Sequence, residues 1–410
     1  MTARAHLPPA FAPLRPPETT LDATLDEALK AIESAGLLRA TREVRRLGGG
    51  RLLIDDREAL DFASNDYLGL AADPRLASAM AAAAASAGAG AGAARLITGT
   101  HPIHTALERE LAQFAGADAA LLFASGFAAN IAVIPALVDE GDVIYSDQYA
   151  HASLIDGCRL SRARTCIVPH GDLVALETRL RAHAGHVRRS LIVVEGVYSM
   201  EGDRVALDRL LPLARRFGAW VMLDDAHAFG VVGPEGRGSA AISWPVGAPD
   251  IIVGTLGKSF GTSGAFVAGS CTLIEYLRHR ARPFVYSTAL APPIAAATRV
   301  ALRIARDEEW RRDRVKEAAR IVRARLRAMG REALGHEESA IVSIPIGDPQ
   351  RTMRVAARLE REGFIVGAIR PPTVPEGTSR LRVTLSAAHE PADLERFCDA
   401  LEAALRTGGE

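Results

Sequence analysis

Short apolar runs alternate with amphipathic stretches through the middle of the chain. The apolar runs have the length of buried strands, whereas the stretches at 172–183 and 207–217 place apolar residues at helical spacing. An alternation of strands with helices is typical of an α/β domain whose mostly parallel sheet has helices on both faces. The predicted strands are residues 119–123, 143–146, 163–168, 191–195, 220–224, 251–255 and 264–268.

The pattern changes on both sides of this region. Residues 21–46 predict one helix with an apolar face, and residues 51–62 predict a short hairpin around a polar turn. Helices at 74–87 and 104–114 lead into the first strand. Beyond Pro292 we expect a second, smaller α/β layer. Its predicted elements are a long helix at 294–329, strands at 340–346, 364–369 and 381–386, and helices at 352–362 and 391–406.

These patterns divide the chain into four parts. We expect a mobile Pro-rich arm at 1–20 and a helix and hairpin segment at 21–60. A large domain at 61–291 and a small C-terminal domain at 292–410 follow. A chain of 410 residues is long enough for two domains.

Composition narrows the possible partners. The chain is 48% hydrophobic with a formal net charge of zero, and no basic block stands out, so we expect no nucleic acid partner. Its four cysteines lack the spacing of a zinc site, which predicts reduced thiols, no metal and a cytoplasmic protein. No apolar run is long enough for a membrane span, and residues 1–20 lack the apolar core of a signal peptide.

One lysine draws attention because lysine is rare here. The chain has 49 Lys+Arg, of which the only lysines are Lys30, Lys258 and Lys316. Lys258 follows a predicted strand and lies between Gly257 and Gly261. A partly desolvated lysine can become a neutral amine that attacks a carbonyl, whereas arginine keeps its proton. The alternative is an ordinary solvated loop lysine.

A second segment favours a chemical role for this lysine. The predicted strand at 220–224 ends in Asp224, Asp225, Ala226 and His227, about one helical crossover before Lys258. Ligands of open α/β sheets bind at such carboxyl ends of strands. A lysine for a Schiff base and an aspartate for a ring nitrogen together fit pyridoxal phosphate. The alternative is a helix cap beside a surface acid.

Several segments taken together resemble the α-oxoamine synthases. They are SNDYLGL (64–70), ASGFAAN (124–130), HAS (151–153), EGVYSMEGD (195–203), DDAH (224–227), GTLGKSFG (254–261) and YST (286–288). Each motif is weak alone, but their order and spacing cover residues 21–406. The resemblance implies a fold-type I transferase that uses pyridoxal phosphate, forms a homodimer with the site at its interface, and joins an amino acid to an acyl thioester with loss of carbon dioxide.

Within that family the C-terminal segments AIRPPTVP (368–375) and RLRVTLSAAH (380–389) discriminate. They resemble the members of biotin biosynthesis that condense L-alanine with a pimeloyl thioester of coenzyme A or a carrier protein. Members that use glycine with an acetyl group, or serine with a long acyl group, stay open. From another class, a pyridoxal phosphate-binding regulator stays open too, although the arm is too short for a DNA-binding module.

The resemblance also implies roles for the residues near the reaction. Lys258 would bind the cofactor covalently and move the α-proton of the substrate, and Asp224 would pair with the pyridine nitrogen. His227 would contact the phenolic oxygen of the cofactor, and His151 would stack on its ring. For the two histidines the alternatives are a structural hydrogen bond and a helix cap.

Other positions are implied to bind the phosphate or the substrate. Amides at Gly126 and Phe127 lie where a predicted helix begins, which suits an anion. Ser199, Thr255 and, from the neighbouring subunit, Thr288 would add hydroxyls, the alternative being local backbone caps. Arg370 would bind the amino acid carboxylate through two parallel hydrogen bonds, with Arg382 as the competing candidate. The remaining substrate candidates are Arg39, Asn65, His151 and Thr373.

Overall fold

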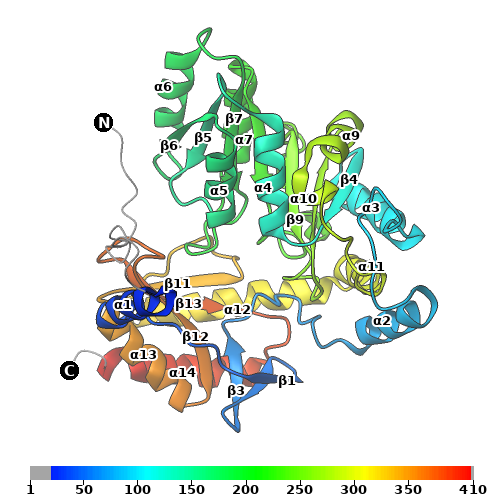
Figure 1. The fold of residues 1–410 in the computed structure, drawn as a ribbon. Coiled ribbons are helices and arrows are strands. Elements are labelled where there is room, and N and C mark those ends of the chain that lie inside the picture. Colours follow the sequence, from blue (N-terminus) through cyan, green and yellow to red (C-terminus); the bar gives the residue numbers. More distant parts are fainter. Residues whose placement is uncertain (1–19, 408–410) are drawn as a thin grey trace.

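The computed structural model describes residues 20–407, and two β-sheets organise them (Figure 1). The larger sheet has seven strands, of which the five from β9 to β6 are parallel, while β10 runs antiparallel to both of its neighbours. This confirms the predicted α/β fold with a mostly parallel sheet. In spatial order the strands are β4 (Ala119–Phe123), β10 (Ala265–Gly269), β9 (Ile251–Thr255), β8 (Trp220–Asp224), β7 (Ser190–Glu195), β5 (Val143–Asp147) and β6 (Arg164–Val168).

Helices cover both faces of this sheet because successive strand side chains point to opposite faces. In β7, Leu191 and Val193 pack in one apolar cluster, whereas Ile192 and Val194 pack in another. The first cluster is completed by α4 (Gly126–Leu137), α5 (Ala152–Leu160), α9 (Cys271–Arg280) and α10 (Arg282–Val285). The second is completed by α2 (Pro74–Ala87), α3 (Pro102–Ala115), α6 (Leu173–His183), α7 (Leu207–Arg216), α8 (Ser239–Ser243) and α11 (Pro292–Asp307).

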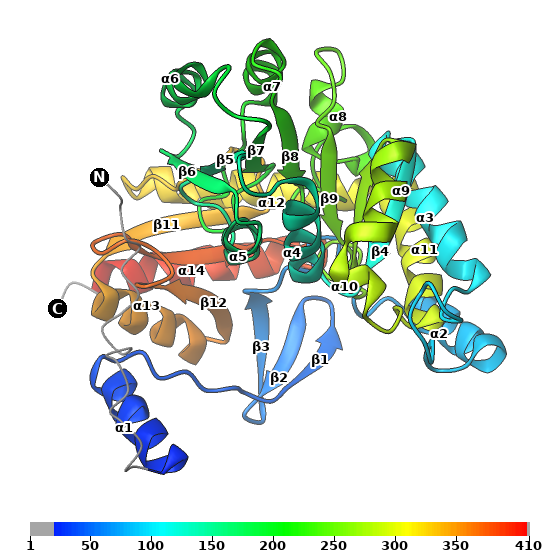
Figure 2. The ribbon, with the colours of Figure 1, turned by 45° about the horizontal axis from the view of Figure 1, so that its top comes forward.

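The second sheet joins segments from the two ends of the chain. β3 (Arg57–Phe62) pairs in parallel with β12 (Phe364–Ile369), which places the N-terminal hairpin beside the C-terminal strands (Figure 2). The sheet also contains β1 (Val44–Gly48), β2 (Arg51–Ile54), β13 (Ser379–Thr384) and β11 (Ile341–Gly347). Its apolar cluster is shared with α12 (Glu309–Ala328), α13 (Pro349–Arg361) and α14 (Pro391–Thr407).

Two element predictions need correction. The helix expected at 21–46 ends much earlier, as α1 (Leu21–Ser34), because Gly36 at φ 66° terminates it and Val44–Gly48 instead pairs with β2. The helix expected at 294–329 is two helices, since Glu308 between them has the non-helical angles φ −100° and ψ 71°. The 51–62 hairpin is confirmed, with Asp55 and Asp56 at positive φ in its turn.

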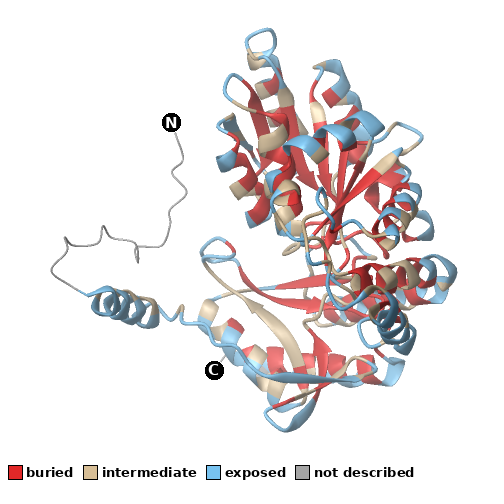
Figure 3. Ribbon diagram, turned by 45° about the vertical axis from the view of Figure 1, so that its right-hand side comes forward, coloured by how far each residue is buried: buried red, intermediate tan, exposed pale blue. Residues whose placement is uncertain are grey.

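Helix α1 stands apart from the rest of the described chain (Figure 3). None of its residues is buried, and its leucines Leu21, Leu25 and Leu29 are at least half exposed. The predicted arm lies outside the described residues, except for Thr20, whose side chain caps this helix. Among residues 20–407, no helix has both the length and the apolarity that crossing a membrane requires.

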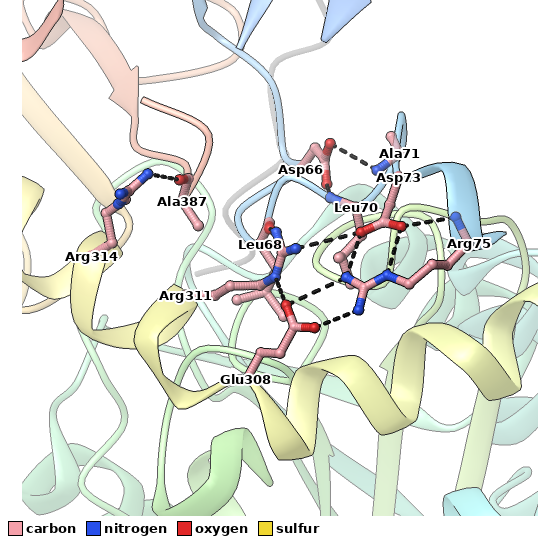
Figure 4. Close-up of polar contacts among 10 residues, drawn as sticks. All are labelled: Asp66, Leu68, Leu70, Ala71, Asp73, Arg75, Glu308, Arg311, Arg314 and Ala387. Atoms are coloured by element: carbon pink, nitrogen blue, oxygen red, sulfur yellow. Dashed lines mark hydrogen bonds and ion pairs between the residues drawn. The ribbon is translucent and has the colours of Figure 1, made fainter. Parts of the chain in front are cut away.

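A polar cluster fixes the segment between β3 and α2 against α12 (Figure 4). The buried Arg311 of α12 donates to the carbonyl oxygen of Leu68 at 2.7 Å and to the carboxylate of Glu308 at 2.8 Å. Asp66 accepts from the amides of Leu70 and Ala71 at 2.8 and 3.0 Å. This loop therefore has one defined path, and it delivers Asn65 and Tyr67 to the carboxyl ends of the large sheet.

Candidate active site

Lys258 lies in the loop between β9 and β10, at the carboxyl end of the large sheet. Its Nζ is 2.8 Å from Nε2 of His227, which follows the neighbouring strand β8. Gly261 lets the loop turn at φ 63°, and a Cβ there would lie 2.4 Å from the amide nitrogen of Ala71. The two backbones therefore pass too close to each other for any side chain at position 261.

The environment of Lys258 favours a neutral amine. Burial lowers the pKa of Lys258 from 10.5 to about 8. The charges of Asp224 and Glu195 oppose that shift, and the charge of Arg382 adds to it. An appreciable fraction of this amine is therefore unprotonated at neutral pH.

His227 is held from its other side by Tyr67. The Nδ1 of His227 is 2.7 Å from the Tyr67 hydroxyl, and both side chains are buried. Burial, together with the charges of Lys258 and Arg382, lowers the pKa of His227 well below its ordinary value. This histidine is thus a neutral hydrogen-bonding group rather than a cation.

Asp224 is a buried carboxylate with fixed orientation. One oxygen accepts from the amide of Ala226 at 3.0 Å, and the other accepts from Nδ2 of Asn130 at 2.7 Å. Asn130, on α4, also donates to the hydroxyl of Ser153 at 2.9 Å. Within residues 20–407 no ion pair engages Asp224, so its charge is available to a cationic ligand atom. Sequence reasoning missed Asn130 as a site residue, although it lies in the quoted 124–130 motif.

His151 begins α5 at the same edge of the sheet. Its amide donates to Oε1 of Glu195 at 2.6 Å, and its Nδ1 is 2.8 Å from the hydroxyl of Ser153. Burial and the charge of Asp224 raise the pKa of Glu195 well above its ordinary value. The backbone of His151 is therefore fixed by a buried carboxyl group, while the residue itself stays exposed.

The beginning of α4 lies next to Thr255. A Cβ added to Gly126 would lie 2.7 Å from Cγ2 of Thr255, so any residue other than glycine would crowd this side chain. Ser125 caps the helix by accepting from the amide of Ala128 at 3.1 Å. The amides of the first helical turn, those of Gly126 and Phe127 among them, have no acceptor within the helix, an arrangement that suits an anionic ligand.

Arg382 of β13 brings the second sheet into the site. Its Nε donates to the carbonyl oxygen of Ser199 at 2.7 Å, and Nη2 donates to Oδ1 of Asn65 at 3.1 Å. The same Asn65 oxygen accepts from the Tyr67 hydroxyl at 3.2 Å, which links Arg382 to His227. Hydrogen bonds therefore connect both sheets to the amine of Lys258.

The other predicted residues lie outside this network. Arg370 comes directly after β12, the strand that pairs with β13 and its Arg382. Thr373 lies three residues further along and is exposed. Arg39 is exposed between α1 and β1, and Thr288 is exposed where it bridges to the backbone of Ala94. Among residues 20–407, no hydrogen bond joins the side chains of these four to the cluster.

The residues present fit pyridoxal phosphate. A desolvated amine, a buried carboxylate that makes no ion pair with any residue from 20 to 407, and a helix N-terminus lie at one edge of one sheet. They match the aldehyde, the pyridine nitrogen and the phosphate of that cofactor. The exposed His151 lies at the same edge and can face a bound ring.

Comparison with known proteins decides the family. The protein-family model described as "Aminotransferase class I and II" matches residues 57–401 of this chain. The chain belongs to this family. It is 46% identical over 384 residues to 8-amino-7-oxononanoate synthase of Geobacter sulfurreducens and also to that of Alkalilimnicola ehrlichii, with 93% of this chain and 97% of each relative covered. These matches confirm the resemblance to α-oxoamine synthases, and the members of this group use pyridoxal phosphate.

Solved structures of the family have the same fold. A serine palmitoyltransferase of Sphingomonas wittichii has a TM-score of 0.90 and 29% identity over 95% of this chain and 99% of its own. An 8-amino-7-oxononanoate synthase of Francisella tularensis has a TM-score of 0.73 and 29% identity over 85% and 98%. A serine palmitoyltransferase solved with pyridoxal phosphate has a TM-score of 0.88 and 30% identity over 95% and 98%. The cofactor assignment thus agrees with the chemistry of the residues around Lys258.

Proposed function

We propose that this enzyme condenses L-alanine with a pimeloyl thioester to give 8-amino-7-oxononanoate, a step of biotin biosynthesis. The main support is the 43–46% identity, across more than nine tenths of the chain, to relatives with the name of that synthase. The acyl carrier is coenzyme A or a carrier protein.

The site residues supply the positions that this reaction needs. Bound pyridoxal phosphate would supply an electron sink for the carbanion formed at the substrate Cα. Lys258, with its pKa lowered to about 8, can bind the cofactor covalently and can accept and return the α-proton. Asp224 would keep a proton on the ring nitrogen, and His227 would donate or accept a hydrogen bond at the phenolic oxygen. His151 would stack on one face of the cofactor ring and restrict the motion of that ring.

The carboxylate of the amino acid needs a cation, and we assign Arg370 to it. Arg382 already donates to Ser199 and Asn65, whereas no hydrogen bond engages the guanidinium of Arg370 within the described residues. Holding that carboxylate sets which bond at Cα lies perpendicular to the ring, and therefore which bond breaks. Arg39, Asn65 and Thr373 remain candidates for further substrate contacts.

A second copy of the chain would complete the site. Ile97 and Tyr286 are 77% and 72% exposed, and they flank the bridge between Ala94 and Thr288. Large exposed apolar residues beside a site are typical of a surface that another subunit covers. We propose a homodimer in which Thr288 reaches the phosphate of the partner site. Light scattering should give twice the chain mass of 43.5 kDa, and a monomer that binds the cofactor with full activity would contradict it.

The state of the cysteine thiols bears on the cellular compartment of the enzyme. All four cysteines are free, as expected in a reducing environment. We propose that the enzyme acts in the cytoplasm.

Serine palmitoyltransferase is the second candidate, because structures of that enzyme match at TM-scores up to 0.90. A substrate matrix separates the two. Alanine, glycine and serine are each offered with acetyl, pimeloyl and palmitoyl thioesters, and products are identified by mass spectrometry. We expect the highest kcat/KM for alanine with pimeloyl thioester. Turnover of another pair without that one would overturn the proposal.

A further inference from the structure

His170 occupies an unusual position beside the site, and none of the roles described so far includes it. It lies between β6 and α6, with its side chain 19% exposed. Its Nδ1 is 2.9 Å from Oδ1 of Asp147, and its Nε2 is 2.8 Å from Oδ2 of Asp203. Both nitrogens of one ring thus face carboxylates.

This geometry requires a protonated ring. A carboxylate oxygen only accepts hydrogen bonds, and a neutral imidazole has a single N–H, so only the imidazolium can donate to both partners. Tyr149 stacks on the ring with centroids 4.6 Å apart, and Tyr198 meets it edge-on at 4.4 Å. Burial lowers the pKa of His170, but the hydrogen bonds to Asp147 and Asp203 and the negative charges of these two residues together outweigh burial and raise it to about 10.

Asp147 connects His170 to the loop that presents His151. This aspartate ends β5, and its Oδ1 also accepts from the amide of Tyr149 at 2.8 Å. Its other oxygen accepts from the amide of Gly171 at 3.1 Å. Two residues after Tyr149 the chain reaches His151. The position of His151 therefore depends on an aspartate that His170 neutralises.

Asp203 connects His170 to the hairpin of residues 198–203, which contains Ser199. The amide of Tyr198 donates to the carbonyl of Asp203 at 3.0 Å, which closes a hairpin over Ser199. Oδ1 of Asp203 is buried without a partner among residues 20–407, so His170 is what holds this carboxylate. Two arginines of β13 donate to the same hairpin. Arg382 donates to the carbonyl oxygen of Ser199 at 2.7 Å, and Arg380 donates to the carboxylate of Glu201 at 2.9 Å.

We propose that His170 is a positioning residue for the reaction, an imidazolium that connects the loop of His151 to the hairpin of Ser199, which Arg382 contacts. The loop of His151 and the hairpin of Ser199 are separate segments of the chain. The His170 cation joins them through one carboxylate on each, Asp147 and Asp203. The inference rests on the proposed function for its effect on turnover, but not for the protonation of the ring.

The charge state is tested in the wild-type protein. Histidine labelled with ¹³C and ¹⁵N is observed by NMR at pH 8, and the His170 signal is assigned from its loss in His170→Asn. We expect imidazolium shifts at pH 8, and a neutral tautomer there would overturn the proposal. The titratable groups that contact the ring or interact with its charge are Asp147, Asp203, Tyr149, Tyr198 and Glu201. Asp172 and Arg204 line the same cavity.

The positioning role is tested by His170→Asn and, in case that variant fails to fold, by Asp203→Asn. His279→Asn is the matched control, because His279 is exposed and also contacts a carboxylate, that of Glu275 at 3.1 Å. We expect kcat to fall about 10- to 100-fold in both test variants, since small displacements of aligned groups have effects of this size. We also expect a changed circular dichroism of the cofactor band, and neither change in the control.

Wild-type kcat and wild-type dichroism in both test variants would overturn the role of His170. A loss of folded protein in His170→Asn leaves Asp203→Asn to decide. If the wild-type enzyme forms no product from alanine and pimeloyl thioester, the proposed function fails, while the NMR signal and the dichroism still test the position of His170.

Discussion

The amine of Lys258 should become reactive at a much lower pH than an ordinary lysine. Its pKa of about 8 lies about 2.5 units below the usual 10.5, because burial disfavours the ammonium form. At pH 7 about 9% of Lys258 is then neutral, against about 0.03% for an unshifted amine, a ratio of about 300. This difference measures how far the fold prepares the residue for attack on an aldehyde.

The other two lysines of the chain serve as internal controls for the reactivity of Lys258. Lys30 on α1 and Lys316 on α12 are the only other lysines, so each can be followed separately in one sample. The protein freed of cofactor is pulse-labelled with an acylating reagent between pH 6 and 10, and the labelled peptides are quantified by mass spectrometry. We expect the labelling rate of Lys258 to rise about tenfold per pH unit and to level off near pH 8.

The midpoint of this titration does not depend on how easily the reagent reaches the amine, because access scales every point equally. A labelling rate of Lys258 that still rises tenfold per unit above pH 9.5 would refute the reasoning. A second variant tests the cause: Arg382→Gln removes a cation that lowers this pKa, so the midpoint should move upward. A midpoint that moves downward would contradict the assigned effect of Arg382.

Four further substitutions test the surrounding residues. Tyr67→Phe leaves Nδ1 of His227 buried without its partner, a cost of about 1–3 kcal/mol, so the melting temperature of the apo-protein should fall, and an unchanged value would count against the contact. Asp224→Asn should still bind pyridoxal phosphate but lose about 100-fold or more in kcat, and near-normal turnover would exclude the ring-nitrogen role. Arg370→Ala should raise KM for alanine more than Arg382→Ala does, and the reverse ranking would exchange their roles.

Much of the fold follows from local pattern. The strands of the large sheet and the hairpin at 51–62 were predictable because each buried strand is a short apolar run with a turn at its end. The meeting of Lys258 with His227 was predictable for a similar reason, since their strands β8 and β9 are parallel neighbours whose carboxyl ends share one edge. In both cases the sequence distance is one crossover or less.

Contacts between distant segments were not predictable in this way. Tyr67 reaches His227 across 160 positions because the Arg311 cluster fixes the path of its loop, and no local pattern encodes that path. The partner of Asp224 is likewise set by how α4 packs on the sheet. Val44–Gly48 pairs with β2 as a strand, although the sequence prediction extended the helix to residue 46. Tertiary pairing overrode local propensity there.

The most direct test of the account locates the covalent bond to the cofactor. The enzyme loaded with pyridoxal phosphate is reduced with borohydride and digested, and the modified peptide is identified by mass spectrometry. Because the chain has three lysines, the assignment is unambiguous. We predict one reduced adduct, on Lys258, and none after Lys258→Ala. An adduct on Lys30 or Lys316 alone, or an adduct that persists in the variant, would contradict the central claim.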